Sequence, residues 1–316
     1  MYFGLPDDAV ALKEGLREVL ATACTPATIR AAWDGDPCEQ LWKVLGEFGV
    51  PGLLVTEDNG GLGLDELGFV AALEELGYAG VPGPVVETLI SLAIAPLPMD
   101  GSARVAVQAL NGPTPHAAVS THVLDLSGTL YELMKGAGEV TETVDRSRQL
   151  ATFDGEALDI DLSDDDVALF ERRGALGTAA LLLGLARRQL DLTVDYVKTR
   201  QQFGVQIGSF QAIKHPLADA VVGTEFAWPA VLRAAQAIID QDDEADLYVS
   251  MAKALASDAA YRMSRVCLQA HGAMGYTVEY DLHLFAKRTW ALSKDWGTAS
   301  DHRELVAEHL GIRSDV

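Results

Sequence analysis

The chain has few basic residues, few cysteines and no long apolar run, and each shortage excludes a class of protein. Lysine and arginine number 24 against 46 aspartates and glutamates, which gives a formal net charge of −22. Nucleic acids and anionic membranes bind basic surfaces, so we expect neither as a partner. The most apolar run, residues 175–186, is too short to span a bilayer, which requires about 20 apolar residues.

Cysteine is equally scarce. The three cysteines, Cys24, Cys38 and Cys267, lack the spacing of a metal site or of a redox pair. Their odd number argues against a disulfide framework, and reduced thiols are typical of the cytosol. The first residues contain no basic segment of the kind that opens a secretory signal. The sequence therefore predicts a cytoplasmic protein with no metal site.

Apolar sequence, in contrast, is sufficient for a substantial core, because 49% of the 316 residues are hydrophobic. Asp36 and Pro37 are residue types that begin a helix. Apolar side chains recur at helical spacing in four segments of the first hundred residues, namely 7–23, 37–48, 65–78 and 84–95. We therefore expect a helical domain over residues 1–100.

Composition changes near Met99. Short β-prone pieces then alternate with Gly, Pro, Asp and Ser, at residues 104–108, 117–120, 122–126 and 139–144. They predict a small β-domain over residues 101–165. The strongly acidic segment 159–166 is interpreted as a solvated linker.

The remaining residues, 166–316, have a helical pattern. Pro216 and Pro229 lie inside one of the segments and predict a kink or a restart there. The apolar periodicity covers residues 174–199, 211–240, 246–271 and 300–310. Long helices joined by short loops indicate a four-helix bundle, so the expected fold class is mainly α with a small β-domain.

Two loops in this helical half carry residues suited to a phosphate-bearing ligand. The first, Arg200 to Gln211, places an arginine, amide side chains and glycines between two helical segments. Arginine offers a fork of donors, and glycine lets backbone N–H groups approach closely. The second loop, Gln269 to Tyr276, has the same chemical character.

Together these stretches resemble the two C-terminal signatures of acyl-CoA dehydrogenases. The residues that carry the resemblance are Arg200-Gln-Gln-Phe-Gly with Ile207-Gly-Ser-Phe-Gln, and Gln269-Ala-His-Gly-Ala-Met-Gly-Tyr. Upstream, residues 50–64, 73–77 and 81–89 resemble the N-terminal pattern of the same family. The resemblance covers nearly the whole chain. It implies the family fold: a helical N-terminal domain, a middle β-domain and a C-terminal helical bundle.

In that family FAD lies between subunits, and the bundle of one subunit binds the ADP half of its neighbour's flavin. The resemblance therefore implies FAD contacts by Arg200 and Gln202 at the adenosine diphosphate, by Phe203, Phe210 and Gln211 beside it, and by Gln269, Gly272 and Ala273 along the pyrophosphate. Ala273 stands where the family has a glycine. Without such a ligand, Arg200 would only complement the dipole at a helix C-terminus, and Gln269 would be a solvated amide at a helix end.

The chain departs from the family at the flavin ring and at the catalytic base. Its β-domain, of roughly sixty residues, is short, and it lacks the family's Thr-Glu-x-x-x-Gly-Ser-Asp-like segment around the isoalloxazine ring. The family's reaction removes a proton from the α carbon of an acyl-CoA while a hydride leaves the β carbon for the flavin. A carboxylate must therefore stand at the α carbon. The two family positions for this carboxylate hold Trp296, in Lys294-Asp-Trp-Gly-Thr, and Gly174.

Two nearby acids are candidate replacements for the base. Glu171 lies one helical turn before Gly174, and Asp295 directly precedes Trp296. Each has the alternative interpretation of an ordinary exposed acid. His271 is interpreted as a loop histidine, because no nucleophile or metal partner stands beside it in the sequence.

These departures resemble the shortened subunit of heteromeric bacterial acyl-CoA dehydrogenases of steroid side-chain degradation. Such enzymes are tetramers with two copies of each of two subunit types. The resemblance implies a chain that supplies the ADP-binding half of a shared FAD site, while a catalytic partner brings the glutamate for α,β-desaturation of an acyl-CoA, such as a steroid side-chain thioester. Two alternatives stay open: a self-sufficient homo-oligomeric acyl-CoA dehydrogenase that uses Glu171, and a scaffold subunit without turnover.

Overall fold

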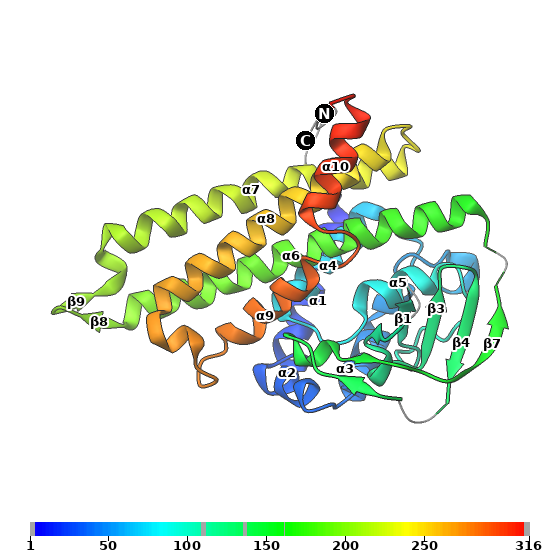
Figure 1. Cartoon of the computed structure of the whole chain (residues 1–316), viewed down its shortest axis with the longest axis horizontal. Helices are drawn as coiled ribbons and strands as arrows, with labels where there is room; N and C mark the ends of the chain where they lie inside the picture. Colours follow the sequence, from blue (N-terminus) through cyan, green and yellow to red (C-terminus); the bar gives the residue numbers. More distant parts are fainter. Residues whose placement is uncertain (1–3, 109–111, 135–137, 161, 313–316) are drawn as a thin grey trace. The chain divides into compact units, whose positions relative to one another are not determined.

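The computed structural model describes residues 4–108, 112–134, 138–160 and 162–312 (Figure 1). The chain divides into two compact units that alternate along the sequence. The mixed unit comprises residues 6–72 and 81–174, and the bundle unit comprises residues 1–5, 73–80 and 175–316. Most described residues are helical and the sheets are small, so the expected fold class is confirmed. The division into three domains at residues 100 and 165 stays a prediction.

Helices form the first part of the mixed unit: α1 (Asp7–Ala23), α2 (Pro26–Trp33), α3 (Glu39–Phe48), the first half of α4 (Glu66–Ala79), and α5 (Val85–Leu92). Helix α2 was not expected from the pattern. The side chain of Thr25 caps it, accepting a hydrogen bond from the backbone N–H of Thr28. Helix α3 begins two residues after Pro37, because Cys38 is left-handed (φ 54°) and serves as its N-cap. The carboxylate of Asp36 accepts a hydrogen bond from the N–H of Cys38, so it stabilises the turn before the helix.

The mixed unit ends in two small sheets. The first has the strand order β1 (Val105–Gln108), β3 (His122–Asp125), β4 (Thr129–Leu133) and β7 (Gly155–Asp159). β1 and β3 are parallel, and the other neighbours are antiparallel. The second sheet has the order β2 (Thr114–Pro115), β6 (Leu150–Ala151) and β5 (Val140–Thr141). Ala106, Ala117, Val123 and Ala151 form a small buried core here, so this part of the chain folds as the expected β region.

The strand expected at residues 117–120 is wrong. Ala117–Val119 form a 3-10 turn (η3), which follows His116 in a left-handed conformation (φ 64°). Ala117 is buried in the core, so its apolar character reflects packing and not an extended backbone. The acidic segment 159–166 also differs from expectation. Asp164 to Asp166 form the first turn of a helix, where carboxylates complement the positive end of the dipole.

Besides the second half of α4, the bundle unit contains five α-helices among the described residues. They are α6 (Asp164–Thr199, from Ala175 onward), α7 (Gln211–Ile239), α8 (Ala245–His271), α9 (Leu282–Leu292) and α10 (Ala299–His309). α7 runs without interruption through Pro216 and Pro229, so the expected restart does not occur. Figure 1 shows α6, α7 and α8 running alongside one another. No described helix is long and apolar enough to cross a membrane.

Close contact between α4 and α6 depends on glycine. A Cβ on Gly77 would lie 2.2 Å from the carbonyl oxygen of Leu181, and one on Gly184 would lie 2.0 Å from that of Glu74. Beside this crossing, the guanidinium of Arg187 donates to the carboxylates of Glu74 and Glu75. Glycine at these two positions therefore lets the backbones of the two helices approach closely.

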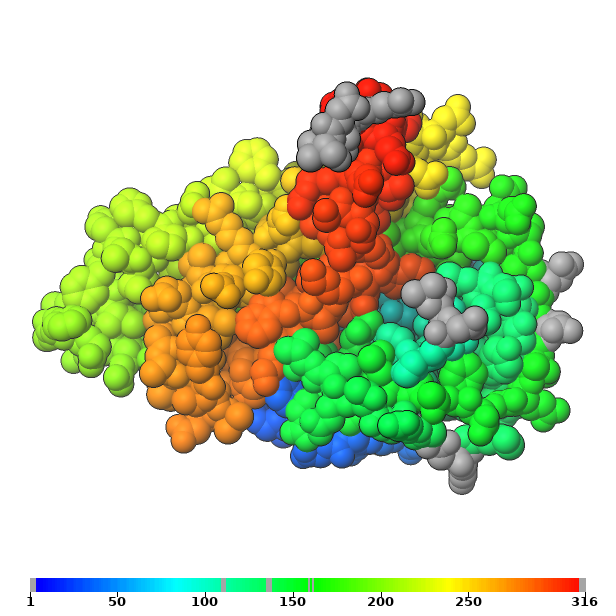
Figure 2. All heavy atoms as spheres, in the orientation of Figure 1, coloured from blue at the N-terminus to red at the C-terminus, as the bar shows by residue number. Residues whose placement is uncertain are grey.

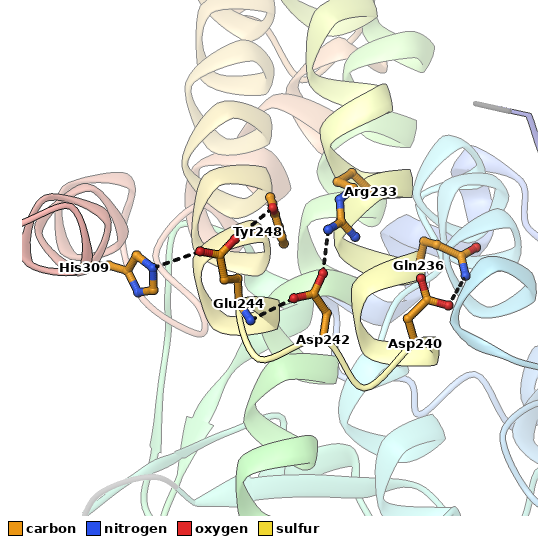
Figure 3. Close-up of polar contacts among 7 residues, drawn as sticks. All are labelled: Arg233, Gln236, Asp240, Asp242, Glu244, Tyr248 and His309. Carbon is orange, nitrogen blue, oxygen red and sulfur yellow. Dashed lines mark hydrogen bonds and ion pairs between the residues drawn. The ribbon is translucent and has the colours of Figure 1, made fainter. Parts of the chain in front are cut away.

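At one end of the bundle unit, the α7–α8 turn is held by charged side chains (Figure 3). The guanidinium of Arg233 lies 3.8 Å from the ring centroid of Tyr248 and donates to Asp242 at 2.6 Å. This hydrogen bond keeps the pKa of Asp242 below its ordinary value. Glu244 accepts a hydrogen bond from the Tyr248 hydroxyl and lies 3.7 Å from His309 of α10. Helix α7 has 29 residues, so this turn is about 43 Å from its N-terminus.

Candidate functional site

The first predicted loop is a short hairpin between α6 and α7. Its strands, β8 (Gln201–Gln202) and β9 (Val205–Gln206), pair antiparallel, and the N–H of Ile207 donates to the carbonyl of Arg200 at 2.9 Å. Phe203 and Gly204 form the turn, with φ of 55° and 80°. Two-residue hairpins favour such positive φ values, but a bulky aromatic residue seldom adopts one. The hairpin therefore holds its tip in a strained conformation.

Exposed aromatic rings accompany this tip. Phe203 is 92% exposed, and its ring centroid lies 6.2 Å from that of Phe210 in an edge-to-face arrangement. The side chains of Arg200, Gln202 and Gln211 are also exposed. Figure 2 shows the hairpin segment uncovered on the face in view. The segment thus presents a cation, amides and aromatic faces outward together.

Gly208 has a different role from the one expected. A Cβ there would lie 2.9 Å from the carbonyl oxygen of Val197, so glycine lets the 3-10 turn η5 (Ile207–Ser209) pack against α6. Gly204, in contrast, has nothing within 4 Å of a Cβ position. Close backbone approach from outside is therefore possible at Gly204, whereas Gly208 serves packing inside the unit.

The second predicted loop is the end of α8 and the 3-10 helix η6 (Gly272–Tyr276). Gly272 has a φ of 59° and ψ of −136°, and nothing lies within 4 Å of a Cβ position on it. Gln269, Gly272 and Ala273 are exposed. This stretch leaves the backbone at Gly272 accessible and exposes the side-chain amide of Gln269, which suits a ligand that carries phosphate groups.

The two loops lie at the same end of the bundle unit, as Figure 1 shows for β8–β9 and the end of α8. The contact that joins them is between side chains that the sequence did not single out for binding. Tyr196, on α6, stacks on His271, the last residue of α8, with ring centroids 4.2 Å apart and an interplanar angle of 18°. Every predicted cofactor residue therefore belongs to one unit and one end of it.

The interpretation of His271 as a loop histidine is wrong. It is only 3% exposed and ends α8, and its Nδ1 is 2.8 Å from the carbonyl oxygen of Cys267. Tyr280 packs against both rings of this stack. Its ring centroid lies 4.8 Å from that of His271 and 5.4 Å from that of Tyr196. Burial lowers the pKa of His271 from its ordinary value, which favours the neutral imidazole.

Comparison with known proteins identifies the family. Residues 6–111 match the acyl-CoA dehydrogenase N-terminal domain, and residues 169–311 match the C-terminal domain of the same family. Acyl-CoA dehydrogenase IpdE2 of Mycobacterium tuberculosis is 32% identical over 304 residues, which cover 90% of this chain and 91% of that protein. The chain belongs to the acyl-CoA dehydrogenase family.

Solved structures of acyl-CoA dehydrogenases have the same fold. The Tcur3481-Tcur3483 steroid ACAD variant has a TM-score of 0.84 at 25% identity, and the match covers 96% of this chain and 98% of that one. The ChsE4-ChsE5 complex from Mycobacterium tuberculosis also has a TM-score of 0.84, at 22% identity, over 99% of this chain and 100% of that one. Members of this family are FAD-dependent oxidoreductases of acyl-CoA thioesters, so the cofactor is FAD.

The residues present fit the ADP half of this acyl-CoA dehydrogenase cofactor. A pyrophosphate requires donors and close backbone approach, which Arg200, the exposed amides and Gly272 supply. Beside the hairpin, between α6 and α7, lies a cleft of about 570 Å³ with mainly apolar walls. Lys198 and Lys214 line it, and none of the described residues that line it carries a carboxylate, although the chain has a net charge of −22. An aromatic base attached to phosphates matches these walls and charges.

The two positions that the sequence predicts for the catalytic base contain no carboxylate. Gly174 is buried in α6, and Glu171, one turn earlier, is exposed. Trp296 is left-handed (φ 53°), and Gly297 follows with φ 90°. Glu171 therefore stays a candidate base by its position alone.

Two buried basic side chains hold the segment around Trp296. The carbonyl of Trp296 lies 2.7 Å from Nε2 of His302, and the carbonyl of Gly297 accepts from Nζ of Lys253 at 2.8 Å. Lys253 is fully buried, and burial lowers its pKa to about 8. The backbone of this segment is thus fixed on both sides, with a side chain at its centre that cannot accept a proton.

Proposed function

We propose that this chain is a subunit of a heteromeric acyl-CoA dehydrogenase, in which it supplies the ADP-binding half of an FAD site. A catalytic partner subunit supplies the glutamate and the site for the flavin ring. One contrast carries the proposal. The residues suited to the ADP half are gathered and exposed at one end of the bundle unit, whereas the two base positions hold Trp296 and Gly174.

The comparisons support the partner. Both solved structures named above combine two differently named proteins, and one of them is called a steroid ACAD. An exposed, strained Phe203 is costly in an isolated chain, and its cost is offset when the tip is buried against another protein or a ligand. We therefore propose a tetramer with two copies of each subunit and one FAD for each pair.

FAD is the hydride acceptor when it is bound. On this proposal the residues of this chain only bind the cofactor and take no part in the chemical step. Arg200 pairs with phosphate oxygens, and Gln202, Gln211 and Gln269 donate amide hydrogens. Gly272 leaves its backbone open to the pyrophosphate. The reaction of the complex is the α,β-desaturation of an acyl-CoA, and we propose a steroid side-chain thioester as its substrate on the strength of the steroid ACAD neighbour.

Co-expression tests this function. The chain expressed alone is expected to purify without yellow colour, because it lacks the flavin-ring site. Co-expressed with its partner, it is expected to yield a complex with about one FAD for every two chains, measured from flavin absorbance after protein quantification. A chain that carries stoichiometric FAD alone supports the self-sufficient enzyme instead, and a colourless complex supports the scaffold.

Substituting Glu171 by Gln distinguishes the proposed heteromeric subunit from a self-sufficient enzyme that uses Glu171 as its base. The variant complex is expected to retain kcat within about twofold, because Glu171 is exposed and has no role in proton transfer on this proposal. The measurement is steady-state desaturation with an artificial electron acceptor. The matched control is Asp165→Asn, at another exposed acid of the same helix. A loss of several orders of magnitude in Glu171→Gln alone would assign the base to Glu171.

A further inference from the structure

The two proposed FAD loops come from different helices, and one aromatic contact connects them. The N–H of Arg200 donates to the carbonyl of Tyr196 at 2.9 Å, so Tyr196 lies one turn before the first loop. His271 lies between Gln269 and Gly272 in the second loop. Besides stacking on His271, Tyr196 donates its hydroxyl to the carbonyl of that residue at 3.5 Å.

A second tyrosine and a glycine complete the support. Tyr280 packs edge-on against the Tyr196 ring and at a tilt against the His271 ring, and it donates its hydroxyl to the carbonyl of Leu192 on α6 at 3.1 Å. Gly275 of η6 lies over His271, because a Cβ on Gly275 would be 3.1 Å from the Cβ of the histidine. The imidazole is thus enclosed by α6, by its own helix and by the second loop.

We propose that Tyr196 and His271 are positioning residues for FAD: their stack fixes the end of α8 against the end of α6, so that both loops reach one ADP group. This inference rests on the proposed function, since it assumes that the two loops share that ligand. The residues themselves do not touch the cofactor on this proposal. They act by setting the separation and orientation of Arg200 relative to Gln269 and Gly272.

The surroundings of the stacked ring favour a neutral imidazole. A carbonyl oxygen only accepts, so the contact with Cys267 places the proton on Nδ1 and leaves a lone pair on Nε2. That Nε2 is buried and has no hydrogen-bond partner among the described residues. A second proton there would create a charge without an acceptor, which is costly in a buried position. Binding of FAD should therefore depend on the charge of this one ring.

Burial disfavours the cation of the ring more than the hydrogen bond to the Cys267 carbonyl favours it. Tyr196 faces it from α6, Tyr280 from the segment before α9, and the carbonyl of Cys267 from α8. Asp195, Asp281 and Arg188 act electrostatically on Tyr280. Burial lowers the pKa of His271 from its ordinary value, so the neutral form is favoured and gives way to the cation as the pH falls through the lowered pKa. We expect FAD affinity to fall over the same range.

The test uses the co-expressed complex, stripped of flavin and titrated with FAD, with the dissociation constant obtained from flavin fluorescence. His271→Ala removes the stack and is expected to weaken FAD binding at pH 7.5 about tenfold or more. His271→Phe keeps an aromatic ring that cannot be protonated. It is expected to bind FAD within about threefold of the unchanged complex at pH 7.5, and to lose the decrease in affinity on going to pH 5.5.

Tyr196→Leu tests the stack from the other helix and is expected to weaken FAD binding as His271→Ala does, so the test does not depend on one variant folding. His309→Ala, at the far end of the bundle unit, is the matched control and should leave the dissociation constant unchanged. Unchanged affinity in either His271→Ala or Tyr196→Leu overturns the proposal, and so does a His271→Phe complex with the original pH dependence. If Arg200→Ala weakens binding while these variants do not, only the positioning role fails. If all three leave it unchanged, the ADP site itself is wrong.

Discussion

Replacing Arg200 with alanine is expected to weaken FAD binding by the assembled complex about 10- to 100-fold. Arg200 is exposed and its guanidinium makes no hydrogen bond or ion pair with the described residues, so its donors are available for a ligand. A hydrogen bond between charged groups contributes about 1.5–3 kcal/mol, which corresponds to this range of affinity. The measurement is the dissociation constant for FAD, together with the flavin content after gel filtration.

Two further variants distinguish the effect of the guanidinium geometry from that of net charge. Arg200→Lys keeps the positive charge and loses the planar fork of donors, so we expect an intermediate loss. Arg303→Ala removes another exposed arginine, whose partner is Asp258, and should leave FAD binding unchanged. Equal effects of Arg200→Ala and Arg303→Ala would show that net charge matters and that the hairpin does not contact the phosphates.

The sequence could predict this loop because its chemistry is local. The run from Arg200 to Gln211 carries its cation, amides and glycines within one segment, and a hairpin between two helices holds them in chain order. The left-handed turn at Phe203 could not be predicted, because Phe at positive φ opposes the residue's own preference. Where a local rule is broken, only the folded chain reveals it.

The support beneath the loops was not predictable for a different reason. Tyr196 and His271 are far apart in the sequence, and a tyrosine and a histidine at helix ends are ordinary residues there. Their pairing depends on how α6 and α8 lie against each other in the bundle unit, which no periodicity encodes. Sequence reasoning correctly found that His271 has no sequential partner, but its partner is tertiary. The same limit explains Ala117, whose apolar character predicted a strand and instead fills a core.

Two arginine–carboxylate pairs have the same donor–acceptor distance but differ in burial, and we expect them to differ in their contribution to stability. Arg187 donates to Glu75 at 2.6 Å, and Arg303 donates to Asp258 at the same distance. The side chain of Glu75 is 1% exposed, whereas those of Arg303 and Asp258 are 57% and 60% exposed. Exposed pairs contribute about 0–1 kcal/mol, because water solvates the separated charges nearly as well.

Replacing Arg187 with alanine is therefore expected to destabilise the bundle unit by about 3–5 kcal/mol, because two buried carboxylates, Glu74 and Glu75, lose the cation that both contact. The measurement is thermal unfolding of the complex, in which we expect a decrease of about 5–10 °C in the midpoint. Arg303→Ala is the control and should change the midpoint by no more than about 2 °C. Adding Glu75→Gln to Arg187→Ala should restore part of the loss, because the carboxamide buries no charge. A double variant no more stable than Arg187→Ala would show that packing of the long arginine side chain, and not its charge, holds α4 against α6.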